Sequence, residues 1–140
     1  MSTSALQALE KLLTEWHADT NNIKKDFLIL KNNFENKSNL QLELIARPGV
    51  SYSLRAAHTA QKKRSLFVMV DIIDDDPKNR WLSVCFYGEM ITDPEEKGDL
   101  IPGGLLGEDG YCFDHEEGSD ENIAYIQDRI DEAYLAAEKE

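Results

Sequence analysis

The spacing of apolar residues near the N-terminus predicts two amphipathic helices. The first should span about residues 4–18, where apolar residues recur at helical spacing: Leu6, Leu9, Leu12, Leu13 and Trp16. The stretch "DTNN" at 19–22 can end this helix and cap the next one. The second helix should then run until "ENKSN", because its apolar residues also repeat with a helical period: Ile23, Phe27, Leu30 and Phe34.

After residue 39 the apolar period changes from 3.6 to 2, which is typical of strands. "LQLELIA" alternates apolar and polar residues, and so does "VSYSLRA" after the turn formers Pro48 and Gly49. Residues 40–57 are therefore predicted to form an antiparallel hairpin with one face in contact with water.

A second pair of strands should follow, and it carries apolar residues on both faces. "SLFVMVDII" (65–73) does not alternate, as in a strand covered on both sides, and "DDDPKNR" separates it from "WLSVCFY" (81–87). The second face of this pair would present Phe67, Met69, Trp81 and Tyr87. The sequence predicts that the N-terminal helices or another protein chain cover these four residues, which form our hypothetical interface.

The last third of the chain predicts an irregular loop region and a closing helix. "IPGGLLG" is rich in glycine, "YCF" could form a short edge strand, and Ser119 is a suitable N-cap for a helix that ends near residue 138. The predicted fold is one α+β domain over 1–140. It consists of two N-terminal helices, a four-stranded antiparallel meander, an irregular Gly/acidic loop region and a C-terminal helix.

The charge of the chain is concentrated in its C-terminal part. The net charge is −12; residues 1–88 carry 12 Lys/Arg and 10 Asp/Glu, whereas residues 89–140 carry 3 and 17. Such a field repels phosphate, so we expect neither nucleic acid nor membrane as partner, but a basic protein or a second copy. The basic cluster "QKKRS" either flanks the buried strand as a gatekeeper or pairs with the acidic third within the fold.

Two cysteines and no apolar run of membrane-spanning length predict a cytoplasmic protein with reduced thiols at Cys85 and Cys112. Cys112, Asp114 and His115 are the candidate metal ligands, since Cys112 and His115 have the spacing of half a zinc site. No second Cys/His pair completes it, the acidic residues do not fit a calcium loop, and the glycines lack a phosphate-loop lysine. We therefore expect no cofactor and assign no catalytic residue.

The function that these patterns favour is a small acidic binding or adaptor module that acts through protein–protein contact. The alternative is a small metal-dependent or thiol-using enzyme with its site in the loop at 107–122, where Cys112 and His115 would act as thiol and base. A pocket with convergent titratable groups beside these two residues would favour the enzyme.

Overall fold

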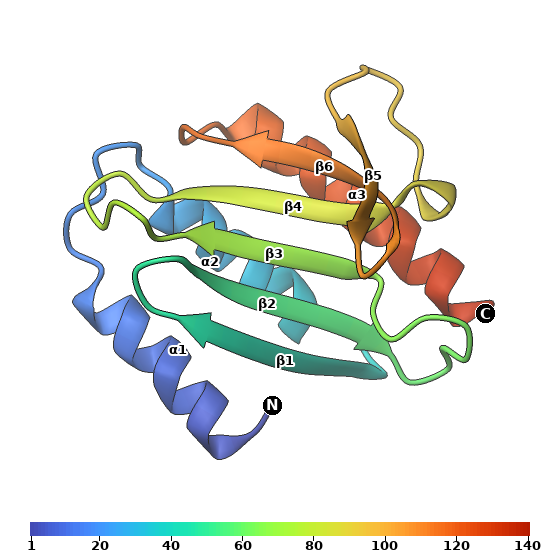
Figure 1. The fold of residues 1–140 in the computed structure, drawn as a ribbon, viewed down its shortest axis with the longest axis horizontal. Helices are drawn as coiled ribbons and strands as arrows, with labels where there is room; N and C mark the ends of the chain where they lie inside the picture. The colour runs from blue at the N-terminus through green and yellow to red at the C-terminus, as the bar shows by residue number, and fades with distance from the viewer.

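The computed structural model describes all 140 residues and has an α+β fold with three helices (Figure 1). The helices are α1 (Thr3–Glu15), α2 (Lys24–Glu35) and α3 (Asp120–Glu138), and none of them is long and apolar enough to cross a membrane. Side chains cap the first turns of α1 and α3: Ser2 accepts from the Ala5 amide, and Ser119, as the sequence predicts, accepts from the Asn122 amide. The Asp19 carboxylate accepts from the first two amides of the second helical segment, those of Ile23 and Lys24.

The strands form one antiparallel sheet of six strands rather than the four predicted. They are β1 (Leu40–Arg47), β2 (Ser51–His58), β3 (Val68–Ile73), β4 (Trp81–Tyr87), β5 (Asp99–Leu105) and β6 (Glu108–His115), with a short 3-10 turn η1 (Gly88–Met90) after β4. Their order across the sheet is β1-β2-β3-β4-β6-β5. The predicted hairpin at 40–57 is confirmed, with Arg47 opposite Ser51 and Gly49 in the left-handed region of the turn.

The two additional strands occupy the region that was predicted to be an irregular loop. Most of β5 is exposed, and its register with β6 shifts between Ile101 and Leu105. An exposed strand with a bulge and two glycines has no alternating apolar pattern, which explains why the sequence did not predict β5. The "YCF" segment was predicted as an edge strand but belongs to β6, which lies inside the sheet; β5 forms the edge beside it, and β1 forms the other edge.

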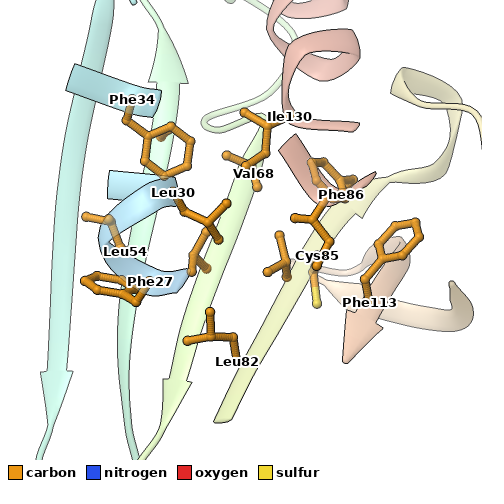
Figure 2. Packing of buried hydrophobic residues seen from close by; sticks show 14 of the residues in the cluster. Phe27, Leu30, Phe34, Leu54, Val68, Leu82, Cys85, Phe86, Phe113 and Ile130 are labelled. Carbon is orange, nitrogen blue, oxygen red and sulfur yellow. The ribbon is translucent and has the colours of Figure 1, made fainter. Parts of the chain in front are cut away.

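The core lies between one face of the sheet and the helices α2 and α3. Figure 1 shows these two helices behind the sheet, whereas α1 runs along its β1 edge. The residues of β3 and β4 that point toward the helices have no exposed surface: Val68, Val70, Ile72, Leu82, Val84 and Phe86. Figure 2 shows Phe27, Leu30 and Phe34 of α2 and Ile130 of α3 packed on this layer. The opposite face of the sheet has no helix on it.

Candidate interaction site

The face of the sheet that no helix covers, called the open face below, presents three rows of side chains that run across the strands. The central row is polar over most of its length: Ile45, Ser53, Asp71, Ser83 and Asp114. One flanking row holds Glu43, Arg55, Met69, Cys85, Cys112 and Asp99, and the other holds Arg47, Ser51, Ile73 and Trp81. Because β3 alternates strictly between buried and partly exposed residues, it is covered by helices on one side only, not on both sides as predicted.

The structure separates the four residues of the predicted interface into two groups. Phe67 is fully buried, and its ring meets Tyr134 of α3 edge-on, so it belongs to the helix-covered core. Tyr87 is 3% exposed, because the Arg64 guanidinium lies 4.4 Å from its ring centroid. Met69 and Trp81 remain partly exposed on the open face. Ile73, which the sequence did not single out, lies opposite Trp81 and is also partly exposed.

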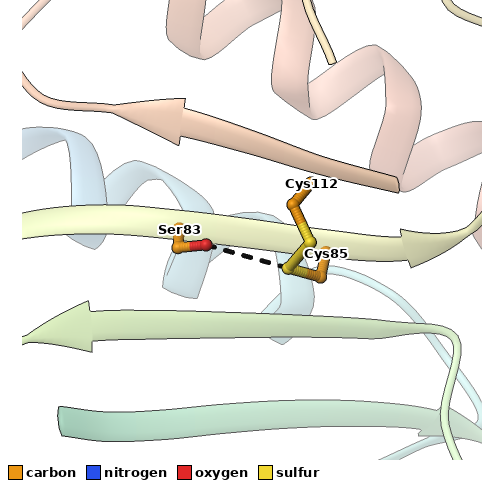
Figure 3. The surroundings of a disulfide bond; sticks show 3 residues. All are labelled: Ser83, Cys85 and Cys112. Atoms are coloured by element: carbon orange, nitrogen blue, oxygen red, sulfur yellow. Dashed lines mark hydrogen bonds between the residues drawn. A yellow bond between two sulfur atoms is a disulfide. The ribbon is translucent and has the colours of Figure 1, made fainter. Parts of the chain in front are cut away.

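Cys85 and Cys112 form a disulfide on the open face, so the prediction of two reduced thiols is wrong (Figure 3). The cysteines are 27 positions apart in sequence, but β4 and β6 are neighbours and place their Cα atoms 4.1 Å apart. This pairing depends on β6, which the predicted topology lacked. Since disulfides persist mainly in oxidising compartments, the cysteines no longer argue for a cytoplasmic protein.

The three candidate metal ligands do not come together. Cys112 is committed to the disulfide, Asp114 is exposed on the open face, and His115 is buried on the other side of β6. Adjacent residues of a strand point to opposite faces, which separates Asp114 from His115. The structure contains no group of three or more His, Cys, Asp or Glu side chains that could hold a metal ion.

His115 takes part in a buried hydrogen-bond network. Its Nε2 lies 2.6 Å from an Asp26 carboxylate oxygen, and its Nδ1 lies 2.7 Å from the Asn122 side-chain nitrogen. The same Asp26 oxygen accepts from the Ser119 amide. Both ring nitrogens therefore have partners and neither faces solvent, which makes this histidine a structural link between α2, β6 and α3.

The acidic side of the open face lies over β6 and the residues that follow it. Burial and the neighbouring charges of Glu116 and Asp99 raise the pKa of Asp114. Burial also raises the pKa of Asp71, although a hydrogen bond from Ser53 and nearby arginines work in the opposite direction. Both shifts indicate carboxylates whose negative charge the chain itself does not fully compensate.

An open cavity of about 590 Å³ lies at the Trp81 end of this acidic side. Its lining consists of Asn21, Trp81, Glu116, Glu117 and Asn122. The cavity thus combines an aromatic ring with polar groups, and no lysine or arginine lines it. The sequence pointed to Trp81, but the approach of Asn21 and Asn122 depends on the tertiary fold.

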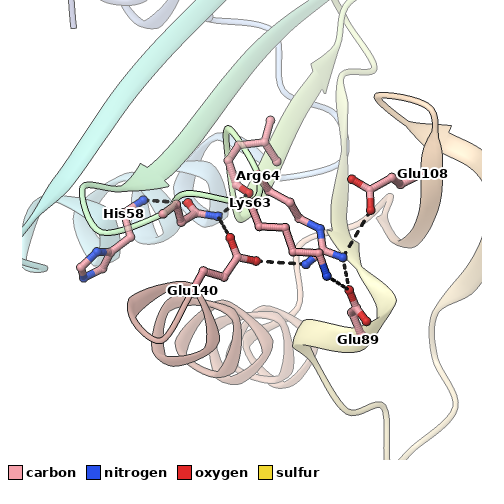
Figure 4. Close-up of polar contacts among 8 residues, drawn as sticks. His58, Lys63, Arg64, Glu89, Glu108 and Glu140 are labelled. Carbon is pink, nitrogen blue, oxygen red and sulfur yellow. Dashed lines mark hydrogen bonds and ion pairs between the residues drawn. The ribbon is translucent and has the colours of Figure 1, made fainter.

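The one basic cluster of the sequence pairs with the acidic C-terminal third, as one of its two interpretations predicts (Figure 4). Arg64 bonds to carboxylates of Glu89, Glu108 and Glu140, which come from η1, β6 and the end of the chain. Burial works against the charge of this guanidinium, but the three carboxylates outweigh it and raise the pKa of Arg64. Arg64 therefore has a structural role, because its ion pairs connect the start of β6 and the C-terminus to the sheet.

Comparison of the chain with protein-family models, curated protein sequences and solved structures finds no match.

Proposed function

We propose that this chain is a non-catalytic protein-binding module and that the open face is its contact surface. The observation that carries the proposal is the one-sided covering of the sheet. Helices bury one face, whereas Met69, Ile73 and Trp81 stay partly exposed on the other beside a polar row. A surface of apolar residues interspersed with polar ones has the composition of a non-obligate protein interface.

The arrangement of the 107–122 region supports binding rather than the alternative enzyme. A thiol-using mechanism needs a free sulfur within reach of a base. Cys112 is disulfide-bonded, and the His115 side chain has no exposed surface and faces the opposite side of β6. The region therefore lacks the thiol and the accessible imidazole that such chemistry requires.

The charge of the chain favours a different protein over a second copy as the partner. Each of two copies would carry a net charge of −12, and their long-range repulsion opposes association. A positively charged partner would instead be attracted over a distance of about 10 Å at moderate salt. The proposed partner is therefore a basic protein.

Site-specific photo-cross-linking tests this function. Benzoylphenylalanine at position 73 probes the open face, and the same probe at position 135 is the matched control, because Leu135 is exposed on α3. In the cells of origin we expect a protein cross-linked from position 73 and not from position 135.

The cross-linked protein, once purified, should bind the wild-type chain directly. We expect Ile73→Asp to weaken this binary complex at least tenfold and Leu135→Asp to leave it unchanged, since a buried charge opposes an apolar contact. Cross-linking only from position 135, or a complex insensitive to Ile73→Asp, would contradict the proposed function.

A further inference from the structure

We infer that the partner docks through a basic segment whose Arg or Lys side chains occupy the acidic side of the open face, between Asp71 and the Trp81 cavity. This inference rests on the proposed function, and it specifies the chemistry of the partner and where its charges lie.

The open face has an uneven distribution of charge. Arg47 and Arg55 lie on the β1–β2 side. Asp114, Glu116 and Glu117 lie on β6 or directly after it, and none of these three makes an ion pair within the chain. Other carboxylates of the acidic third do pair within the chain: Arg64, for example, bonds to those of Glu89, Glu108 and Glu140. The unpaired carboxylates are therefore available to cations from outside.

Asp71 adds an unsatisfied acceptor to the centre of the face. One of its carboxylate oxygens is buried and has no hydrogen-bond partner. The residue lies between Ser53 and Ser83 in the polar row and is partly exposed. The carboxylate is partly exposed and its negative charge is only partly compensated within the chain, so it attracts an incoming guanidinium or ammonium group. A charge-assisted hydrogen bond from such a group would offset that charge.

The Trp81 cavity presents acceptors and an aromatic ring to a ligand. The ionised carboxylates of Glu116 and Glu117 accept hydrogen bonds but cannot donate them. The Asn122 side-chain nitrogen is engaged with His115, which leaves the amide oxygen of Asn122 as its free polar atom. A ligand group that matches this lining carries several donors and a positive charge, and it can stack on an indole. The arginine guanidinium has all three properties, and the lysine ammonium has the first two.

A short arginine peptide tests the inference without the natural partner. The probe is N-acetyl tetra-arginine amide, and its neutral control is the tetra-citrulline peptide, which has nearly the same shape. In NMR titrations we expect the arginine peptide to shift the Trp81 indole and Asn122 side-chain signals saturably, and the citrulline peptide to leave them in place. Equal shifts from both peptides would overturn the inference.

Charge-neutralising variants locate the site. Asp114→Asn/Glu116→Gln/Glu117→Gln should weaken binding of the arginine peptide about tenfold, as three exposed pairs of moderate strength would. The matched control, Glu10→Gln/Glu96→Gln/Asp128→Asn, removes the same net charge from exposed positions elsewhere and should change binding less than about twofold. Equal weakening by both variants would overturn the inference, since the binding would then come from the general field.

The two proposals fail separately. Suppose that Ile73→Asp weakens binding of the cross-linked protein, whereas the Asp114/Glu116/Glu117 variant binds it with wild-type affinity. The basic-segment inference is then wrong and the proposed function stands. If the arginine peptide binds at Trp81 but no protein complex depends on Ile73, the proposed function is wrong.

Discussion

His115 and Asp26 are 89 residues apart in sequence, and their side chains meet in the core with an Nε2–Oδ2 distance of 2.6 Å. Neither side chain has exposed surface. The hydrogen bond from Asn122 to Nδ1 assigns the ring proton to Nε2, which then donates to Asp26. A single buried network thus fixes α2 to β6 and to the start of α3, both of which are distant from α2 in sequence.

Loss of the Asp26 carboxylate should destabilise the fold strongly. Asp26→Ala leaves the His115 ring N–H and the Ser119 amide without their acceptor in a buried environment. We expect the free energy of unfolding to fall by about 3 kcal/mol. Urea denaturation measures it, with the exposed Asp128→Ala as a control that should stay close to wild type. A loss below about 1 kcal/mol for Asp26→Ala would mean that the network contributes little.

Reduction of the Cys85–Cys112 disulfide should lower stability without unfolding the chain under native conditions. The bond closes a loop between positions 27 apart, for which the chain-entropy model gives roughly 3–4 kcal/mol. We expect a phosphine reductant to lower the urea midpoint of the wild type and to have no effect on the Cys85→Ser/Cys112→Ser variant. Two thiols that react with iodoacetamide in the untreated protein would contradict the pairing.

Asp71 should oppose folding at neutral pH because burial raises the pKa of its carboxyl group. A raised folded pKa means that the folded chain binds this proton more tightly than the unfolded chain does. The stabilising proton is present at low pH and is lost as pH rises through the folded pKa. Asp71→Asn should therefore raise the urea midpoint at neutral pH, and the gain should shrink as the solution becomes more acidic.

Asp71→Asn should also weaken binding of the arginine peptide, because it removes a negative charge from the open face. Greater stability combined with weaker binding is typical of a residue retained for function. Asp128→Asn is the matched control, as it neutralises an exposed carboxylate on α3 and should change neither property. If Asp71→Asn destabilises the protein at neutral pH, the carboxylate has a structural role instead.

The sequence predicted those elements whose apolar residues follow a regular period. The helix that begins after Ser119 and the hairpin around Pro48-Gly49 are confirmed because local residues determine both. The strand β5 was missed, since an exposed strand that contains Pro102 and two glycines has no such period. Of β6, only the "YCF" segment was predicted, and as an edge strand. The placement of β6 then determined two features that the sequence could not show: the Cys85–Cys112 pairing and the burial of His115.

The candidate site was predictable only in part, for the same reason. Met69 and Trp81 were identified from strand alternation, and the structure leaves both partly exposed. Phe67 has the same parity but precedes β3 and packs under α3, a contact that depends on how the last helix crosses the sheet. Two charged residues of the site, Asp71 and Asp114, lie in one row only because β6 pairs with β4 in the six-stranded sheet.

Hydroxyl-radical footprinting of the complex with the partner recovered through position 73 shows whether the partner docks on the open face, because it measures the exposure of individual side chains. On complex formation we predict that the oxidation rates of Met69 and Trp81 fall several-fold. Those of Leu28 and Leu135, which are 40% and 54% exposed on the helical side, should stay unchanged. Unchanged rates at Met69 and Trp81 together with protection of Leu28 or Leu135 would place the partner on the helices and contradict the account.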